Sequence, residues 1–265
     1  MYDFKLKNLN AHEVNELLPP NLIMLGYRGS VAHGTHVMPD DPAGIDDKDL
    51  MGVFVAPLDH YIGFGMHDHH EKFIKEWDAV SYEVRKMFRL LLKCNPNVMS
   101  LLYLPENLFV YKSELAELLI KNRSIFVSKQ AYHSFSGYAH SQLKRMISGD
   151  FAGYMGEKRK RLVEQFGFDC KNGAHLIRLL RMGIEFLTDG ELHVVREDAK
   201  QLIDIKKGRW ALEHIKEESD RLFKLAELAY VNSKLPDRPD YAAAEKLLME
   251  IIMKFHQLNN TRFAK

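Results

Sequence analysis

Cysteine is scarce in this sequence, with only Cys94 and Cys170 among 265 residues. The two lie far apart and form no Cys-x-x-Cys pair, which excludes a framework of disulfides. We therefore expect two buried or half-buried free thiols in a protein of a reducing compartment.

Long apolar runs are missing as well. None approaches the roughly 20 residues that a membrane-spanning helix needs, so no membrane partner is expected. The segment Met1–Asn10 alternates apolar and charged side chains and lacks the apolar centre of a signal peptide. Both observations predict a cytoplasmic protein.

An excess of either charge is absent too, because 37 lysines and arginines face 36 aspartates and glutamates, for a formal net charge of +1. Such a balance produces no overall field that would attract a nucleic acid. Locally, Lys158–Arg161 and Lys206–Arg209 are compact basic runs. Each is either a solvated helix face or a binding site for phosphate. The hydrophobic fraction of 46% is ordinary for a globular protein.

Short apolar runs separated by turn residues predict strands in the first part of the chain. Residues 21–27 suit a buried strand, and residues 50–56 suit a second one. Residues 72–77 suit a third strand, and residues 78–82 either continue it or form a fourth. A short helix is expected at 12–18, where a pair of prolines ends it.

After Glu83 the apolar residues recur with the helical period of about 3.6 residues. The expected helices are 113–121, 131–149, 155–166, 171–188, 198–205, 209–233 and 241–258. The sequence thus predicts an α+β protein. A small mixed-sheet domain occupies about residues 1–105, and an all-helical domain at 106–265 closes over it.

The residues that carry chemistry lie around the first two expected strands. Gly29 and Ser30 follow the first strand, and Asp47-x-Asp49 opens the second. Residues i and i+2 of a strand point to one face, so Asp47 and Asp49 present two carboxylates side by side. Such a pair repels unless a cation lies between the groups, which favours Mg²⁺ or Mn²⁺. Gly29 allows close approach to a phosphate, and Ser30 adds a hydroxyl and an N–H.

These residues resemble a known signature. Gly29-Ser30-x-Ala32-x-Gly34-Thr35 followed by Asp46-Asp47-Lys48-Asp49 is similar to the GS…DxD element of the DNA polymerase β-like nucleotidyltransferases. Three later blocks resemble a bacterial and phage family within that superfamily, the RNA-repair or RNA-ligase-associated polymerase β family. These blocks are Tyr82–Phe88, Asn95-Pro96-Asn97 and Lys171–Glu185. The likeness covers about residues 24–240, which is most of the chain.

The resemblance implies a polymerase β-like fold and a metal-dependent nucleotidyltransferase. Such an enzyme moves a nucleoside monophosphate from a nucleoside triphosphate to a hydroxyl of an RNA 3′ end, a protein or a small molecule, and releases pyrophosphate. It further implies a third carboxylate, for which Asp78 is our choice and for which Glu83 and Glu76 compete. Asp47, Asp49 and Asp78 are then both the catalytic residues and the metal ligands.

One position departs from the family pattern. Many members have a serine just before the DxD element, whereas this chain has Asp46. Asp46 is either an extra ligand or base, or a solvated turn residue. The histidines His33 and His36 of the same loop either line the nucleotide or merely belong to the loop.

Basic residues of the block at 171–185 are candidates for binding the nucleotide. Lys171, His175 and Arg178 fall near one helical face, and cations packed over a carboxylate–metal site suit triphosphate oxygens. Arg181 is a weaker candidate, and Arg28, just before the Gly-Ser turn, could also contact phosphate. The competing interpretation is a solvated basic face with one core histidine.

Two other functions stay open at this point. The cluster His67-Asp68-His69-His70 is either a metal site, as in metal-dependent phosphohydrolases, or a solvated loop. The chain is also compatible with a nucleotide-binding module that has lost turnover, although intact Asp47 and Asp49 argue against such a loss.

Overall fold

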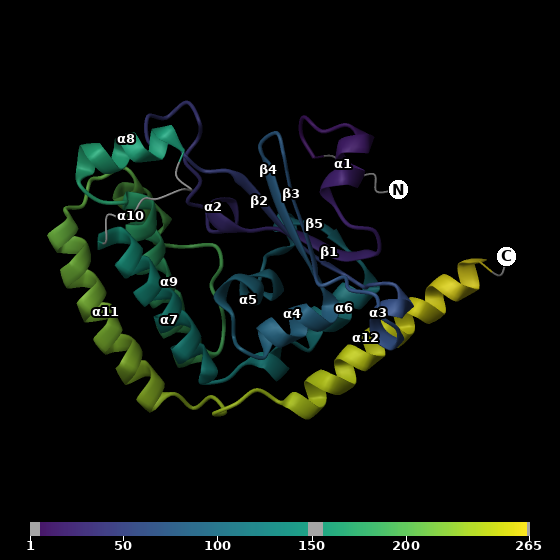
Figure 1. Ribbon diagram of the computed structural model, residues 1–265. Helices are drawn as coiled ribbons and strands as arrows, with labels where there is room; N and C mark the ends of the chain where they lie inside the picture. The colour runs from purple at the N-terminus through teal and green to yellow at the C-terminus, as the bar shows by residue number, and fades with distance from the viewer. Residues whose placement is uncertain (1–5, 148–155, 264–265) are drawn as a thin grey trace.

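The computed structural model describes residues 6–147 and 156–263. A mixed sheet flanked by short helices forms one half of the molecule, and a layer of longer helices forms the other (Figure 1). This arrangement confirms the predicted α+β class. The ends of the helices expected at 131–149 and 155–166 reach residues 148, 149 and 155, which lie outside the described part of the chain.

The sheet has the strand order β3-β4-β2-β1-β5. β2 and β4 run parallel, whereas the other neighbours are antiparallel. The strands are β1 (Leu22–Tyr27), β2 (Lys48–Phe54), β3 (His69–Ile74), β4 (Trp77–Glu83) and β5 (Phe109–Lys112).

The segment 72–82 resolves into two strands. Lys75 adopts a left-handed conformation with φ of 56°, and the chain reverses there, so that Ile74 pairs with Trp77 in an antiparallel ladder. Of the two alternatives left open by the sequence, the fourth strand is therefore correct.

β5 was not expected from the sequence. It has only four residues, all half-buried at the edge of the sheet, and so short a segment shows no clear period. β5 pairs with β1, so the sheet continues past residue 105. The division of the chain into two domains at that residue stays a prediction.

Pro96 separates two helices, of which the first ends at Leu91 and the second begins at Pro96. It occupies the first turn of a new helix, where the missing N–H costs nothing. The Asn95 side chain caps that helix by accepting hydrogen bonds from the backbone N–H groups of Asn97 and Val98.

Helices cover both faces of the sheet and make up the second half of the molecule. Around the sheet lie α1 (Ala11–Leu17), α2 (Gly29–Ala32), α3 (Leu58–Ile62), α4 (Val84–Leu91), α5 (Pro96–Leu102) and α6 (Glu114–Lys121), with two 3₁₀ turns at Glu106–Leu108 and Arg123–Phe126. The helical half contains α7 (Gln130–Ile147), α8 (Glu157–Phe166), α9 (Cys170–Asp189), α10 (Ala199–Lys206) and α11 (Leu212–Asn232). α12 (Tyr241–Phe263) then returns to the sheet half, where it packs against α4 and α6.

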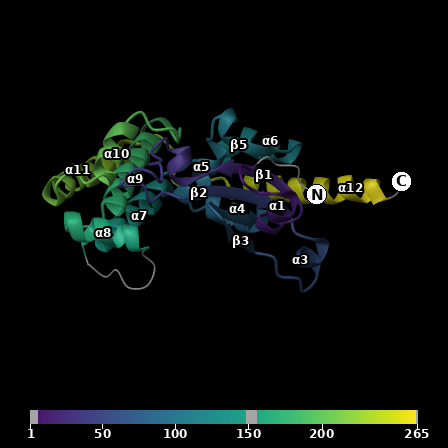
Figure 2. The same ribbon diagram turned by 90° about the horizontal axis from the view of Figure 1, so that it is seen from above.

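α9 is the central helix of the helical half and packs against α7, α10 and α11. Seen from above, these helices lie together at one end of the molecule and the sheet lies at the other (Figure 2). The larger of two buried apolar clusters runs from β2 and β4 through α4 and α5 into α7 and α9. Its continuity fixes the position of α9 relative to the edge of the sheet that carries the expected site.

Two expectations drawn from absences can be compared with the structure. Cys94 and Cys170 are both buried free thiols, as predicted. Across the described ranges, we find no helix with the length and apolar character to cross a bilayer.

Candidate active site

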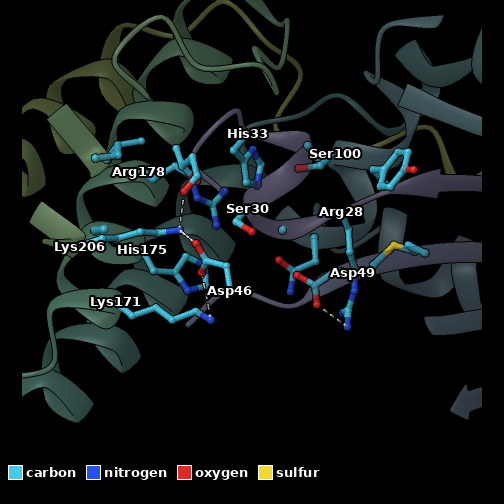
Figure 3. Close-up of a pocket in the computed structure, with 18 of the residues that line it drawn as sticks. Arg28, Ser30, His33, Asp46, Asp49, Ser100, Lys171, His175, Arg178 and Lys206 are labelled. Atoms are coloured by element: carbon cyan, nitrogen blue, oxygen red, sulfur yellow. Dashed lines mark hydrogen bonds and ion pairs between the residues drawn. The ribbon is translucent and has the colours of Figure 1, made fainter. Parts of the chain in front are cut away.

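A cavity of about 280 Å³ lies between the turn that follows β1 and the helices α9 and α10 (Figure 3). The sheet half and the helical half each contribute one wall. Of the nine main candidates for catalysis and nucleotide binding, Asp47 and Asp78 do not line this cavity and seven do: Arg28, Gly29, Ser30, Asp49, Lys171, His175 and Arg178. They come from segments about 120 or more residues apart in the sequence, so the fold brings the two predicted groups together.

The Gly-Ser turn is held tightly against β2. Gly29 has φ of 61°, a left-handed conformation that suits glycine, and a Cβ at this position would collide with the Asp49 carboxylate. Next to it, the Arg28 N–H donates to the Asp49 carbonyl over 3.0 Å. Only glycine permits this approach of the turn to Asp49. The Ser30 hydroxyl is hydrogen-bonded to His36 Nδ1 at 3.0 Å, so His36 supports the turn.

Two of the three predicted carboxylates lie side by side. Asp49 of β2 and Asp78 of β4 are register partners on neighbouring parallel strands, so their side chains share one face of the sheet. The Arg28 guanidinium lies 3.0 Å from Asp78 Oδ2 and 3.6 Å from Asp49 Oδ1. Arg28 therefore offsets the repulsion between the two carboxylates.

Burial raises the pKa of Asp49 to about 6 against the opposing charge of Arg28, and the Asp78 and Asp47 carboxylates add to the rise. A buried carboxylate that lies among other carboxylates is stabilised in its ionised form by any cation that binds beside it. This electrostatic environment fits a divalent metal.

Asp47 is placed less favourably than expected. It lies just before β2, is exposed to solvent, and does not line the cavity. Nowhere in residues 6–147 and 156–263 do three or more His, Cys, Asp or Glu side chains gather in a group that could hold a metal ion. Mg²⁺ is nevertheless commonly held by one or two carboxylates together with waters and substrate phosphates. The oxygen donors of Asp49 and Asp78 fit that mode of binding.

The two competitors of Asp78 have structural partners elsewhere. Glu83 lies at the other end of β4, is buried, and accepts hydrogen bonds from Tyr61 Oη at 2.6 Å and from the Lys86 N–H at 3.1 Å. Glu76 pairs with Lys48 Nζ at 2.6 Å. None of the three lines the cavity, but Asp78 is the register partner of Asp49 and shares Arg28 with it, which favours Asp78.

α9 carries the cations of the opposite wall. Its first turn is capped by the buried Asp169, which accepts from the N–H groups of Lys171 and Asn172. Lys171, His175 and Arg178 follow at a spacing that turns all three toward the cavity (Figure 3). Their predicted place in the pocket is thus observed, whereas their roles stay predictions.

Arg178 and His175 have unused hydrogen-bonding capacity. Within the described part of the chain, Arg178 forms no ion pair, and the partner found for its Nη1 is the weak acceptor Met182 Sδ at 3.2 Å. Burial, with a contribution from Arg196, lowers the pKa of Arg178 to about 9. The Nε2 atom of His175 is buried, and no hydrogen-bond partner for it is found among residues 6–147 and 156–263. Burial first, and then the positive charge of Arg178, hold the pKa of His175 well below its usual value.

Arg181, the weaker candidate, belongs to a different environment. It donates to Asp198 Oδ2 at 2.6 Å and to Glu218 Oε1 at 3.1 Å, and it does not line the cavity. It connects α9 with α10 and α11 and leaves no donor directed at a ligand.

Two residues have roles in the pocket that sequence reasoning did not assign. Lys206 at the end of α10 lines the cavity; the basic run at 206–209 had marked it without indicating where it points. Asp46 is not a solvated turn residue, and its alternative role as an extra ligand or base stays a prediction. It is buried and pairs with Lys206 Nζ at 2.8 Å and Lys171 Nζ at 3.2 Å.

The other histidines that the sequence singled out lie in two different places. His33 lines the cavity and donates from Nδ1 to the Val194 carbonyl at 2.8 Å. The segment His67–His70 is a partly exposed stretch that leads into β3. No metal-binding group includes it in the portion of the chain that the structure describes. His67 and Asp68 are exposed and precede β3, whereas His69 and His70 are its first two residues, so the segment is not a loop throughout.

Comparisons with known proteins identify the family of the chain. The model of the RNA repair pathway DNA polymerase beta family, RlaP, matches residues 5–250. A solved nucleotidyltransferase-like protein from Exiguobacterium sibiricum 255-15 is 13% identical, with a TM-score of 0.29, over 89% of this chain and 75% of that chain. No curated protein matches the chain.

Proposed function

The chain belongs to the RNA repair pathway DNA polymerase beta family, and from this premise we propose that it is a metal-dependent nucleotidyltransferase. It transfers a nucleoside monophosphate from a nucleoside triphosphate to a hydroxyl acceptor, with release of pyrophosphate. The observation that carries the proposal is the two-walled cavity. Asp49 lies at one wall with its register partner Asp78 beside it, and Arg178, which forms no ion pair among the described residues, lies at the other wall.

The carboxylates supply the metal site and the base. Asp49 and Asp78, with Asp47 beside them, would hold Mg²⁺ or Mn²⁺ through carboxylate oxygens. When bound, the metal neutralises phosphate charge and lowers the pKa of the attacking hydroxyl. A carboxylate oxygen of Asp78 takes the proton of that hydroxyl. The hydroxyl oxygen then forms a bond to the α-phosphorus, and the bond from the α-phosphorus to the bridging oxygen of pyrophosphate breaks.

The opposite wall binds the leaving group. Arg178 and Lys171 donate to the oxygens of the β- and γ-phosphates, and His175 offers its free Nε2. Gly29 and Ser30 approach the phosphates with backbone N–H groups and a hydroxyl. These contacts orient the α-phosphorus toward the carboxylates and stabilise the charge that develops on pyrophosphate.

The acceptor is a hydroxyl of an RNA 3′ end, a protein or a small molecule. The name of the family points to RNA, and RNA is our first choice. The lining of the cavity supports a triphosphate site and does not distinguish among the acceptors, since both walls carry groups that suit phosphate or metal.

The test is transfer of label from each α-³²P-labelled nucleoside triphosphate, with Mg²⁺ or Mn²⁺ and with total cellular RNA or protein. We expect the wild type to label a macromolecule and the Asp47→Ala/Asp49→Ala variant to fail. Glu76→Gln is a matched control, since it alters a carboxylate in the turn between β3 and β4 that is paired with Lys48 outside the cavity. It should retain transfer.

Two outcomes would replace the proposal. Bound nucleotide without transferred label and without pyrophosphate would favour a binding module without turnover. Release of orthophosphate in place of pyrophosphate would indicate a phosphohydrolase.

A further inference from the structure

The loop that joins the Gly-Ser turn to Asp47 is held mainly by lysines of the helical half. Lys158 Nζ donates to the Pro39 and Asp41 carbonyls at 3.1 and 2.9 Å. Lys207 Nζ pairs with the Asp41 carboxylate at 2.6 Å. These two contacts lie at the outer end of the loop, away from the cavity.

At its inner end the loop contains one buried carboxylate. The side chain of Asp46 is 1% exposed and accepts the Val37 N–H at 3.0 Å. Lys206 and Lys171 approach it from the helical half, as Figure 3 shows. The lysines come from α10 and from the first turn of α9, and both line the cavity.

Each of these lysines is anchored twice. Lys206 Nζ donates to the Thr35 carbonyl at 2.8 Å as well as to Asp46 Oδ2. Lys171 Nζ donates to the Ile45 carbonyl at 3.1 Å and lies 3.2 Å from Asp46 Oδ1. An ammonium group has three N–H donors. Lys206 uses two donors in hydrogen bonds and Lys171 uses one, since its contact with Asp46 is an ion pair without a hydrogen bond. Each lysine therefore keeps at least one donor for a ligand in the cavity.

We propose that Asp46 is a positioning residue of the phosphate site, which holds the ammonium groups of Lys171 and Lys206 so that each presents its remaining N–H to the phosphates of the nucleotide. The proposal rests on the nucleotide site proposed above. Because Asp46 directly precedes Asp47, one carboxylate also ties the phosphate-binding cations to the segment that carries the metal-binding carboxylates.

The direction in which Asp46→Asn changes the affinity for a polyanion distinguishes a positioning role from simple charge balance. If Asp46 only neutralised its neighbours, Asp46→Asn would leave the cavity more positive and would tighten the binding of a polyanion. If Asp46 positions the lysines, the same change releases them and weakens binding. Asparagine keeps a side-chain oxygen for the Val37 N–H, so the loop retains that hydrogen bond.

The probe is inorganic triphosphate with Mg²⁺, which contains no base and cannot be transferred to an acceptor. Calorimetric titration of the full chain measures its Kd. We expect Asp46→Asn to raise the Kd about tenfold, the usual worth of one charge-assisted hydrogen bond. Asp41→Asn is the matched control, because it removes the same charge from the same loop and from a lysine partner outside the cavity. It should leave the Kd unchanged.

Two further variants keep the test decisive. Asp46→Glu preserves the charge but displaces the carboxylate, and it should also weaken binding, whereas a pure charge effect predicts no change. Lys206→Met should raise the Kd, and adding Asp46→Asn to it should cost less than in the wild type, because part of the Asp46 effect passes through Lys206. Thermal unfolding without ligand identifies any variant that fails to fold.

The outcomes also separate this proposal from the proposed function. Tighter or unchanged triphosphate binding by folded Asp46→Asn would overturn the positioning role even if the wild type transfers label. If Asp46→Asn raises the Kd but the wild type transfers no label, the positioning role of Asp46 is intact and the proposed transferase activity is overturned. Absence of triphosphate binding by the wild type would overturn the phosphate site itself.

Discussion

Arg178 and Arg181 lie one turn apart on α9 and have opposite surroundings. Arg181 is enclosed by Asp198 and Glu218, and it ties three helices together. Arg178 faces the cavity and has no ion pair in the described part of the chain, although burial lowers its pKa to about 9. Arg196, which packs near both, follows the pattern of Arg181, with Glu185 and Asp198 as partners.

The difference teaches how the helical half separates stability from binding. A buried cation without a carboxylate costs folding free energy, whereas one inside a hydrogen-bonded pair is compensated. A cost of this kind at a cavity is expected where a ligand supplies the missing charge. Under the proposed function, the pocket face of α9 would serve the substrate, and the Arg181 side serves the fold.

The largest effect is expected from Arg178→Met. It removes the cation that the phosphates would use and keeps an apolar stem of similar length. We expect kcat/KM for label transfer to fall roughly 100-fold, as for a lost charged contact worth about 3 kcal/mol. The free energy of unfolding should stay equal or rise, because an unpaired buried charge is removed. A clear loss of stability with unchanged kcat/KM would reverse the assignment of the two arginines.

Arg181→Met should show the complementary behaviour. It leaves Asp198 and Glu218, whose side chains are 17% and 13% exposed, without their shared partner. We expect the free energy of unfolding to fall by about 2 kcal/mol, less than for a fully buried pair because water still reaches the carboxylates. Chemical denaturation measures this loss. The Kd for inorganic triphosphate should stay within about twofold of the wild type, which Arg178→Met should not.

The sequence was informative where chemistry depends on neighbours along the chain. The alternation of Asp47 and Asp49, the Gly29 turn and the period of α9 all follow from local geometry, and the structure places Gly29, Asp49 and α9 around one cavity. Asp47 was predicted to share that place and is exposed instead. Its position just before β2 frees it from the ladder that fixes Asp49.

Contacts between residues of the sheet half and residues of the helical half could not be predicted in the same way. Asp46 and Lys206 are 160 residues apart, and no periodic pattern specifies which helix end meets which loop. Their contact depends on the packing of α10 against α9, which is set by the shared core. β5 escaped notice for a related reason, since an edge strand of four residues is defined by its pairing with β1.

A smaller effect is expected on the pH dependence of the free energy of unfolding, through His175. Burial, together with Arg178, Lys206 and Lys171, holds the pKa of His175 well below 6.5 in the folded protein. Just below pH 6.5 the unfolded chain therefore binds a proton at His175 that the folded protein does not bind. The stability that is present above about pH 6.5 is lost as the pH falls below that value. We expect His175→Leu to flatten this decline by roughly 1 kcal/mol between pH 6.5 and 5.5. Urea titrations at several pH values measure it, and parallel curves for the two proteins would contradict the prediction.

The smallest effect is expected from Lys158→Ala, in the basic run at 158–161. Lys158 is exposed and donates to the Pro39 and Asp41 carbonyls, outside the cavity. Exposed contacts of this kind contribute at most about 0.5 kcal/mol, and the Kd for inorganic triphosphate should not change. A rise in Kd as large as that of Lys206→Met would extend the phosphate site to the outer end of the loop. A cation outside the cavity would then also bind phosphate, and the wall of the cavity would no longer separate substrate-binding cations from cations that stabilise the fold.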